Sequence, residues 1–89
     1  MEKTIERYLC SKVKNVGGMC LKLTNYKGIP DRLILLNGEA VFVEVKDTGK
    51  QLRYEQKVFQ EKLRDLGFNA YVVDSKDDVD ALMCKFFIV

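Results

Sequence analysis

The dipeptide Asn37-Gly38 lies between two apolar runs and restricts the fold of this chain more than any other feature. Asn-Gly is the strongest short-range signal for a β-hairpin, because both residues of its two-residue turn need positive φ. We therefore predict two antiparallel strands, Asp31–Leu36 and Ala40–Lys46, on either side of this turn. The second strand alternates valines with other residues, which predicts that one of its faces is buried.

Further helices and strands are predicted around the hairpin from hydrophobic periodicity and turn residues. They are a helix over 2–15, a strand over 19–24, a helix between Gln51 and Leu66, a strand over 68–74 and a helix over 76–87. A hairpin followed by a strand–helix–strand crossover gives a mixed sheet with helices packed on it. The order αβββαβα therefore predicts an α/β fold, and 89 residues suffice for a single domain over 1–89.

The chain contains no histidine, which excludes several kinds of active site. It cannot form a Ser-His or Cys-His nucleophile pair or a histidine-ligated zinc site. It also cannot be a nuclease that uses histidine as its general base. Any hydrolytic chemistry must therefore come from carboxylates, lysine and a hard metal ion.

The cysteines and the apolar residues indicate where such a chain works. Cys10, Cys20 and Cys84 are odd in number and lack CxxC spacing, so we expect small buried side chains rather than a disulfide framework. A reducing intracellular compartment fits this pattern: the cytoplasm of a bacterium or of a phage-infected host cell, or the nucleus in a eukaryote. No apolar run exceeds four residues and the N-terminal region is charged, so neither a membrane span nor a secretory signal is expected.

Positive charge is concentrated in the N-terminal part of the chain. The net charge is only +2, but residues 1–27 carry six Lys or Arg against two Glu, whereas residues 67–89 carry two Lys against four Asp. A basic pole of this kind is typical of a protein with an anionic partner, and it also arises on an ordinary solvated surface.

The predicted hairpin brings two carboxylates together. With a two-residue turn, Asp31 lies directly across from Glu44, and Lys46 projects from the same face one step beyond. Like charges at this spacing are destabilising, so a cation is needed, and either Lys46 or a divalent metal could supply it. Oxygen ligands of this kind suit Mg²⁺ or Mn²⁺. Two alternatives stay open: a four-residue turn would place Asp31 opposite Lys46, and the cluster could be a surface ion pair.

Two further polar residues lie on or beside predicted apolar helix faces. Gln56 falls within a stripe of otherwise apolar residues, which are Leu52, Phe59, Leu63 and Leu66. A buried amide needs partners, so Gln56 either faces a polar site on the sheet or reaches solvent from an edge position. Glu6 lies on the flank of the apolar face of the first helix, as an exposed acid or as a further carboxylate aimed at the site.

Three motifs give the sequence a resemblance to a known family. Gly28-Ile29-Pro30-Asp31, followed by Glu44-Val45-Lys46 and by Gln56, resembles the PD-(D/E)XK nucleases, and most of all their virus-type replication–repair nuclease (VRR-NUC) domain. The resemblance runs from Glu6 to the last helix and implies an αβββαβ core. One departure is the segment 52–56, because relatives commonly have serine-proline before the glutamine.

The resemblance implies Mg²⁺- or Mn²⁺-dependent hydrolysis of DNA phosphodiesters, with a role for each matching position. Asp31 and Glu44 match the metal-binding acids, and the backbone carbonyl of Val45 matches a third ligand. Lys46 matches the lysine that positions the attacking water. Gln56 matches the helix glutamine, and Glu6 matches the acid of the first helix. Candidate phosphate contacts near the basic pole are Lys14, Lys22, Lys27, Arg32, Lys50 and Arg53.

Stand-alone members of this size resemble Holliday-junction resolvases, which cut paired strands as homodimers. We therefore expect a homodimeric, structure-selective DNA endonuclease acting on branched DNA. The apolar C-terminus, 86–89, could form part of the dimer interface or complete the core. Alternatives are a flap, nicking or restriction-like nuclease and, outside enzymes, a non-catalytic DNA-binding module on the same fold.

Overall fold

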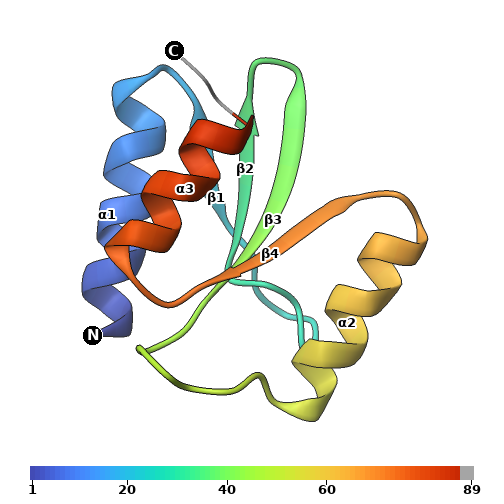
Figure 1. Cartoon of the computed structure of the whole chain (residues 1–89). Coiled ribbons are helices and arrows are strands. Elements are labelled where there is room, and N and C mark those ends of the chain that lie inside the picture. Colours follow the sequence, from blue (N-terminus) through green and yellow to red (C-terminus); the bar gives the residue numbers. More distant parts are fainter. Residues whose placement is uncertain (87–89) are drawn as a thin grey trace.

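The computed structural model describes residues 1–86, which form three helices and four strands (Figure 1). In chain order these are α1 (Glu2–Asn15), β1 (Met19–Lys22), β2 (Arg32–Leu36), β3 (Glu39–Val45), α2 (Tyr54–Asp65), β4 (Asn69–Val73) and α3 (Lys76–Phe86). All seven elements match the predicted order, with ends that differ by a few residues. No helix in this part of the chain is long and apolar enough to span a membrane.

The four strands form one mixed sheet in the order β1-β2-β3-β4. The pairs β1–β2 and β2–β3 are antiparallel, whereas β3 and β4 are parallel and are joined through α2. Helices α1 and α3 pack against each other on one face of the sheet, and α2 stands apart from them, packed against β4 (Figure 1). The predicted α/β architecture is therefore confirmed.

The hairpin between β2 and β3 has the two-residue turn that Asn37-Gly38 predicts. Both residues have positive φ, 53° and 76°. Leu36 pairs with Glu39 and Leu33 with Phe42, so the register is the one that places Asp31 across from Glu44. The alternative four-residue turn is thereby excluded.

The two faces of β3 have different surroundings. Val41, Val43 and Val45 are fully buried and belong to a core that includes Ile5, Leu9 and Val13 of α1, Ile34 of β2, Val73 of β4, and Val79 and Leu82 of α3. Side chains alternate across a strand, so the residues between these valines point to the opposite face. The hydrophobic pattern of β3 thus leaves that second face free to carry polar side chains.

Helix α2 buries an amide outside the inward stripe that the sequence predicts for it. Its buried residues are Gln60 and Leu63, whereas Leu66 is 60% exposed because the helix ends before it. The prediction that Leu66 points inward is therefore wrong. Gln60 is satisfied inside the protein: its Nε2 donates to the Tyr71 carbonyl at 3.4 Å, and its Oε1 accepts from Arg64 at 3.0 Å.

The prediction of three buried cysteines is wrong for Cys84, whereas Cys10 and Cys20 are half-buried. Cys84 is exposed, and Cys10 of α1 lies against Cys20 of β1 with their sulfur atoms 2.7 Å apart. Burial, followed by the contact with Cys10, raises the pKa of the Cys20 thiol to about 12. Cys20 is therefore protonated at neutral pH and is a weak nucleophile.

Gly28 brings the loop before β2 into direct contact with the first turn of α2. Its φ is +81°, and a Cβ at this position would lie 2.5 Å from the backbone oxygen of Glu55. Glycine is required here for two reasons, since its φ is unfavourable for other residues and no side-chain atom fits against the helix backbone.

Replacing Gly28 by alanine is therefore expected to lower the free energy of unfolding by about 2–4 kcal/mol, as strain at positive φ adds to a backbone clash. Urea denaturation of the purified protein measures this loss. Gly67→Ala is the matched control, because Gly67 has φ +90° with open space where its Cβ would be, so only the conformational cost of about 1 kcal/mol applies. Equal losses in the two variants would contradict the close contact.

Candidate active site

Asp31 and Glu44 meet at the end of the hairpin opposite the turn. Asp31 immediately precedes β2, and its Oδ2 accepts a hydrogen bond of 2.8 Å from the backbone N–H of Val45 in β3. This bond fixes the Asp31 carboxylate against the strand that carries Glu44. The sequence-predicted pair of acids is thus brought together in space.

Glu44 is a buried carboxylate with one oxygen that has no hydrogen-bond partner. Only 2% of the residue is exposed. Its Oε2 accepts a hydrogen bond of 2.9 Å from the side-chain amide of Gln56 and lies 3.7 Å from the ammonium of Lys46, whereas its Oε1 has no partner. A buried carboxylate oxygen without a partner is costly, so this atom is suited to a cation.

The surroundings of Glu44 favour its neutral form in the absence of a cation. Burial, followed by the negative charge of Asp31, raises the pKa of Glu44 to about 7, and the ammonium of Lys46 only partly opposes this. Carboxylates with strongly raised pKa values are enriched at functional sites. The electrostatics therefore single out the same residue as the geometry does.

Gln56 reaches the site from the first turn of α2. Its Nε2 donates to Glu44, and its Oε1 accepts a hydrogen bond of 2.9 Å from the backbone N–H of Arg53, the residue before the helix. One amide thus caps the helix and fixes a carboxylate oxygen of Glu44. The predicted polar partner for Gln56 is found, although the side chain is half-buried rather than within the core.

Glu6 is engaged in ion pairs with neighbouring basic residues. Its Oε2 accepts from Arg32 Nε at 2.7 Å and from Lys22 Nζ at 3.1 Å. Burial acts in the opposite direction, but these two cations lower the pKa of Glu6. The described contacts of Glu6 are therefore with Arg32 and Lys22. Glu2, one turn earlier in α1, is the acid of this helix whose negative charge helps to raise the pKa of Glu44.

Glu2 is a site neighbour that sequence periodicity does not identify. Its backbone N–H donates to the carboxylate of Asp47, which follows β3, so the start of α1 is attached beside the end of that strand. The signal that could have revealed it is the acid in the first helical turn, but this also occurs as an ordinary partner of the helix dipole.

The six predicted phosphate-contact residues fall into three groups. Lys22 and Arg32 are ion-paired with Glu6, and Lys14 lies in the last turn of α1, the end away from Glu2. The three others are Lys27, Lys50 and Arg53, which lie exposed in the loops before β2 and before α2. Those two loops lead directly to Asp31 and Gln56, so their cations are close in sequence to the site.

The donor set fits a divalent ion bound with water rather than a closed protein cage. Within residues 1–86 no group of three or more His, Cys, Asp or Glu side chains is placed to hold a metal. Two carboxylates with a free buried oxygen are instead typical of a Mg²⁺-type site, in which one or two carboxylates and several waters complete the shell.

Comparison with known proteins agrees with this arrangement. A solved structure described as a VRR-NUC domain is similar to this chain, with a TM-score of 0.90 and 32% sequence identity over 97% of both chains. The phage protein named "Putative nuclease p44", from Acyrthosiphon pisum secondary endosymbiont phage 1, is 38% identical over 84 residues and covers 85% of each chain. The chain belongs to the VRR-NUC family. No protein-family model matches its sequence.

Membership of the VRR-NUC family identifies this protein as a nuclease and confirms the family resemblance seen in its sequence motifs. The three helices and four-stranded mixed sheet are those of the VRR-NUC fold. The roles of individual side chains remain predictions that rest on the geometry described above.

Proposed function

We propose that this VRR-NUC protein is a Mg²⁺- or Mn²⁺-dependent, structure-selective DNA endonuclease, and that its substrate is the four-way Holliday junction. The observation that carries the proposal is the buried Glu44 carboxylate, whose Oε1 has no partner while Asp31 and Lys46 lie beside it. A buried carboxylate with an unpartnered oxygen beside a second acid is destabilising in isolation, and a divalent cation would relieve it.

Asp31, Glu44 and the backbone carbonyl of Val45 would hold the ion. The Val45 N–H donates to Asp31, and the N–H and C=O of one strand residue point to the same side, which supports a carbonyl directed toward Asp31. A bound Mg²⁺ or Mn²⁺ supplies Lewis-acid activation of the phosphodiester and lowers the pKa of the attacking water.

The chain's own groups position the remaining partners of the reaction. Gln56 fixes Oε2 of Glu44, so the carboxylate keeps Oε1 available. Lys46, whose side chain is 12% exposed, keeps a positive charge beside the acids, where it can orient the water and offset charge on the phosphate. Glu6 would act at a distance, by holding Arg32 and Lys22 in place.

A homodimer is part of the proposal because two coordinated cuts require two sites related by a twofold axis. The face of the sheet opposite α1 and α3 offers an apolar surface for it: Met19 and Leu21 of the edge strand β1 are exposed, and Leu33, Leu35 and Phe42 beside them are partly exposed. Phe86 packs against Tyr71 at 5.2 Å between ring centroids, and residues 87–89 of the C-terminal segment lie outside the described residues.

The proposed substrate is tested with purified protein, Mg²⁺ or Mn²⁺, and end-labelled DNA. We expect symmetric cuts in a four-way junction, with linear duplex of the same sequence cut at least about tenfold more slowly, and no cleavage in EDTA. Sedimentation of the free protein is expected to give a dimer.

The same panel of substrates distinguishes the alternatives. Preferential cutting of a flap would indicate a flap nuclease instead of a junction-specific one. Equal cutting of duplex and junction would indicate a nicking or restriction-like nuclease. Salt-sensitive DNA binding without metal-dependent cleavage would indicate a non-catalytic module and contradict the proposal.

An intracellular location, in the cytoplasm of a phage-infected bacterium, follows within this proposal from the DNA substrate and the phage origin of the similar nuclease.

A further inference from the structure

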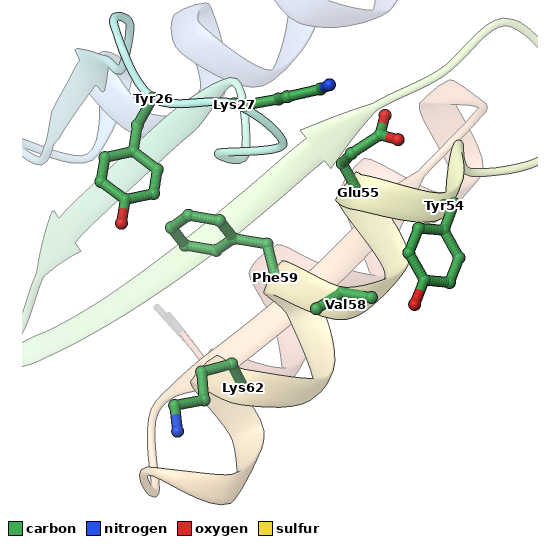
Figure 2. A pocket seen from close by; sticks show the side chains of 7 residues that line it. All are labelled: Tyr26, Lys27, Tyr54, Glu55, Val58, Phe59 and Lys62. Carbon is green, nitrogen blue, oxygen red and sulfur yellow. The ribbon is translucent and has the colours of Figure 1, made fainter.

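A groove beside the candidate active site is lined by aromatic side chains and lysines. It encloses about 400 Å³ between the loop before β2 and α2, and its lining residues are Tyr26, Lys27, Tyr54, Glu55, Val58, Phe59 and Lys62 (Figure 2). This volume lies in the range of sites for small organic ligands. The mechanism proposed above uses none of the seven residues except Lys27, as a candidate phosphate contact.

The two tyrosine rings of the groove are exposed, whereas Phe59 is half-buried. Tyr26 is 70% exposed and Tyr54 is 77% exposed. Tyr26 contacts Phe59 edge-to-face, with 5.6 Å between ring centroids, so the two rings form adjoining walls at one end, while Tyr54 lies at the start of α2 (Figure 2). Exposed aromatic faces of this kind are stacking platforms for flat ligands such as nucleobases.

The charges around the rings suit a nucleotide rather than an apolar peptide. Lys27 and Lys62 extend from opposite sides of the groove, from the loop and from the third turn of α2 respectively (Figure 2). They provide cations for phosphates on both sides of a bound base. Glu55 is the one acid of the lining, and a carboxylate accepts hydrogen bonds from an exocyclic amino group such as that of cytosine.

The groove shares both of its walls with the candidate active site. The loop that carries Tyr26 and Lys27 continues through Gly28 to Asp31, and Glu55 is followed by Gln56, which donates to Glu44. The loop and the helix meet at Gly28, where a Cβ would lie 2.5 Å from the backbone oxygen of Glu55. A DNA strand that lies in the groove would therefore lead toward the acids.

We propose that the groove binds an unpaired nucleobase of the DNA strand next to the scissile phosphate, in the space between the adjoining rings of Tyr26 and Phe59 at one end and Tyr54 at the other. Bases within a duplex present only their edges, whereas an unpaired base offers the face that such rings require. This inference rests on the proposed function and refines it: the strands of a four-way junction are paired up to the branch point, and a base there must leave its pair to enter the groove. The groove then favours DNA with unpaired nucleotides at the cut position over continuous duplex.

The test is equilibrium binding in Ca²⁺ or EDTA, where no cleavage occurs, to a duplex and to the same duplex with a short unpaired segment. The wild-type protein is expected to bind the unpaired DNA about tenfold more tightly, and to quench 2-aminopurine placed in that segment. In Tyr26→Ala and Tyr54→Ala this ratio is expected to fall toward one, whereas Tyr26→Phe keeps it. Phe68→Ala is the matched control, because Phe68 is a 50% exposed aromatic residue outside the groove.

The outcomes separate this inference from the proposed function. A ratio near one in the wild-type protein, or a ratio that Tyr26→Ala and Tyr54→Ala leave unchanged, would overturn the stacking site even if the protein cleaves junctions. A ratio that depends on the two tyrosines supports the site, even if the protein cleaves no DNA in Mg²⁺, in which case only the proposed function fails. Competition by an apolar peptide but not by single-stranded DNA would also refute the inference.

Discussion

Asp31→Asn is expected to reduce Mg²⁺-dependent DNA cleavage by about two to three orders of magnitude or more. Asparagine keeps the shape of the side chain, and its carbonyl oxygen can still accept the hydrogen bond from Val45 N–H. The substitution therefore removes the negative charge that would hold the cation and leaves the fold in place. Initial rates of junction cleavage, measured at several Mg²⁺ concentrations, report this loss.

Asp77→Asn is the matched control, because Asp77 is an exposed acid in the first turn of α3. It is expected to cleave at the wild-type rate. Asp31→Asn should have a melting temperature close to that of wild type. The loss of activity then reflects the loss of metal binding and not of folding. Cleavage by Asp31→Asn at a rate within a few-fold of wild type would remove Asp31 from the metal site.

The second large effect is a pH dependence of stability that is caused by Glu44. The pKa of Glu44 is raised to about 7 in the folded protein, whereas an unfolded chain has a pKa near 4.5. The folded state therefore holds a proton that the unfolded state releases in this interval. The stability associated with this residue is fully present below pH 4.5 and is lost as the pH rises through about 7, an effect of about 3 kcal/mol.

Urea unfolding of the metal-free protein in EDTA at a series of pH values measures this effect. In Glu44→Gln, which keeps the shape without the titrating group, this contribution should vanish, and the variant should exceed wild type in stability at pH 8. Glu61→Gln is the control, since Glu61 is exposed on α2 and its substitution should leave the wild-type profile unchanged. Parallel profiles for wild type and Glu44→Gln would show that Glu44 is not the source.

The hairpin and its pair of acids could be predicted from the sequence because their determinants are local. A two-residue turn specifies the register, and the register specifies which side chains lie opposite each other. Asp31 and Glu44 thus follow from Asn37-Gly38 by counting along two strands. The alternating valines of β3 also place Glu44 on the face opposite the core, but they do not predict that this residue is only 2% exposed, because its burial depends on the segments packed over that second face.

Features that depend on packing between distant segments could not be predicted in this way. The periodicity of α2 does not show where the helix ends or how much of the sheet it covers, so it places the exposed Leu66 on the inward face and does not identify the buried Gln60. The contact of Cys10 with Cys20 depends on the angle between α1 and β1. The aromatic groove likewise exists only because Gly28 allows the loop to approach α2.

Strand β3 places the core on one face and the candidate active site on the other, so its length is constrained more tightly than its composition. Insertion or deletion of one residue between Gly38 and Glu44 would exchange the two faces, because a shift of one residue inverts every side chain beyond it. Valines would then line the site, and Glu44 and Lys46 would enter the core. Insertions and deletions are thus expected to be tolerated during evolution in the loop between β3 and α2, and to be eliminated within β3 even where substitutions persist.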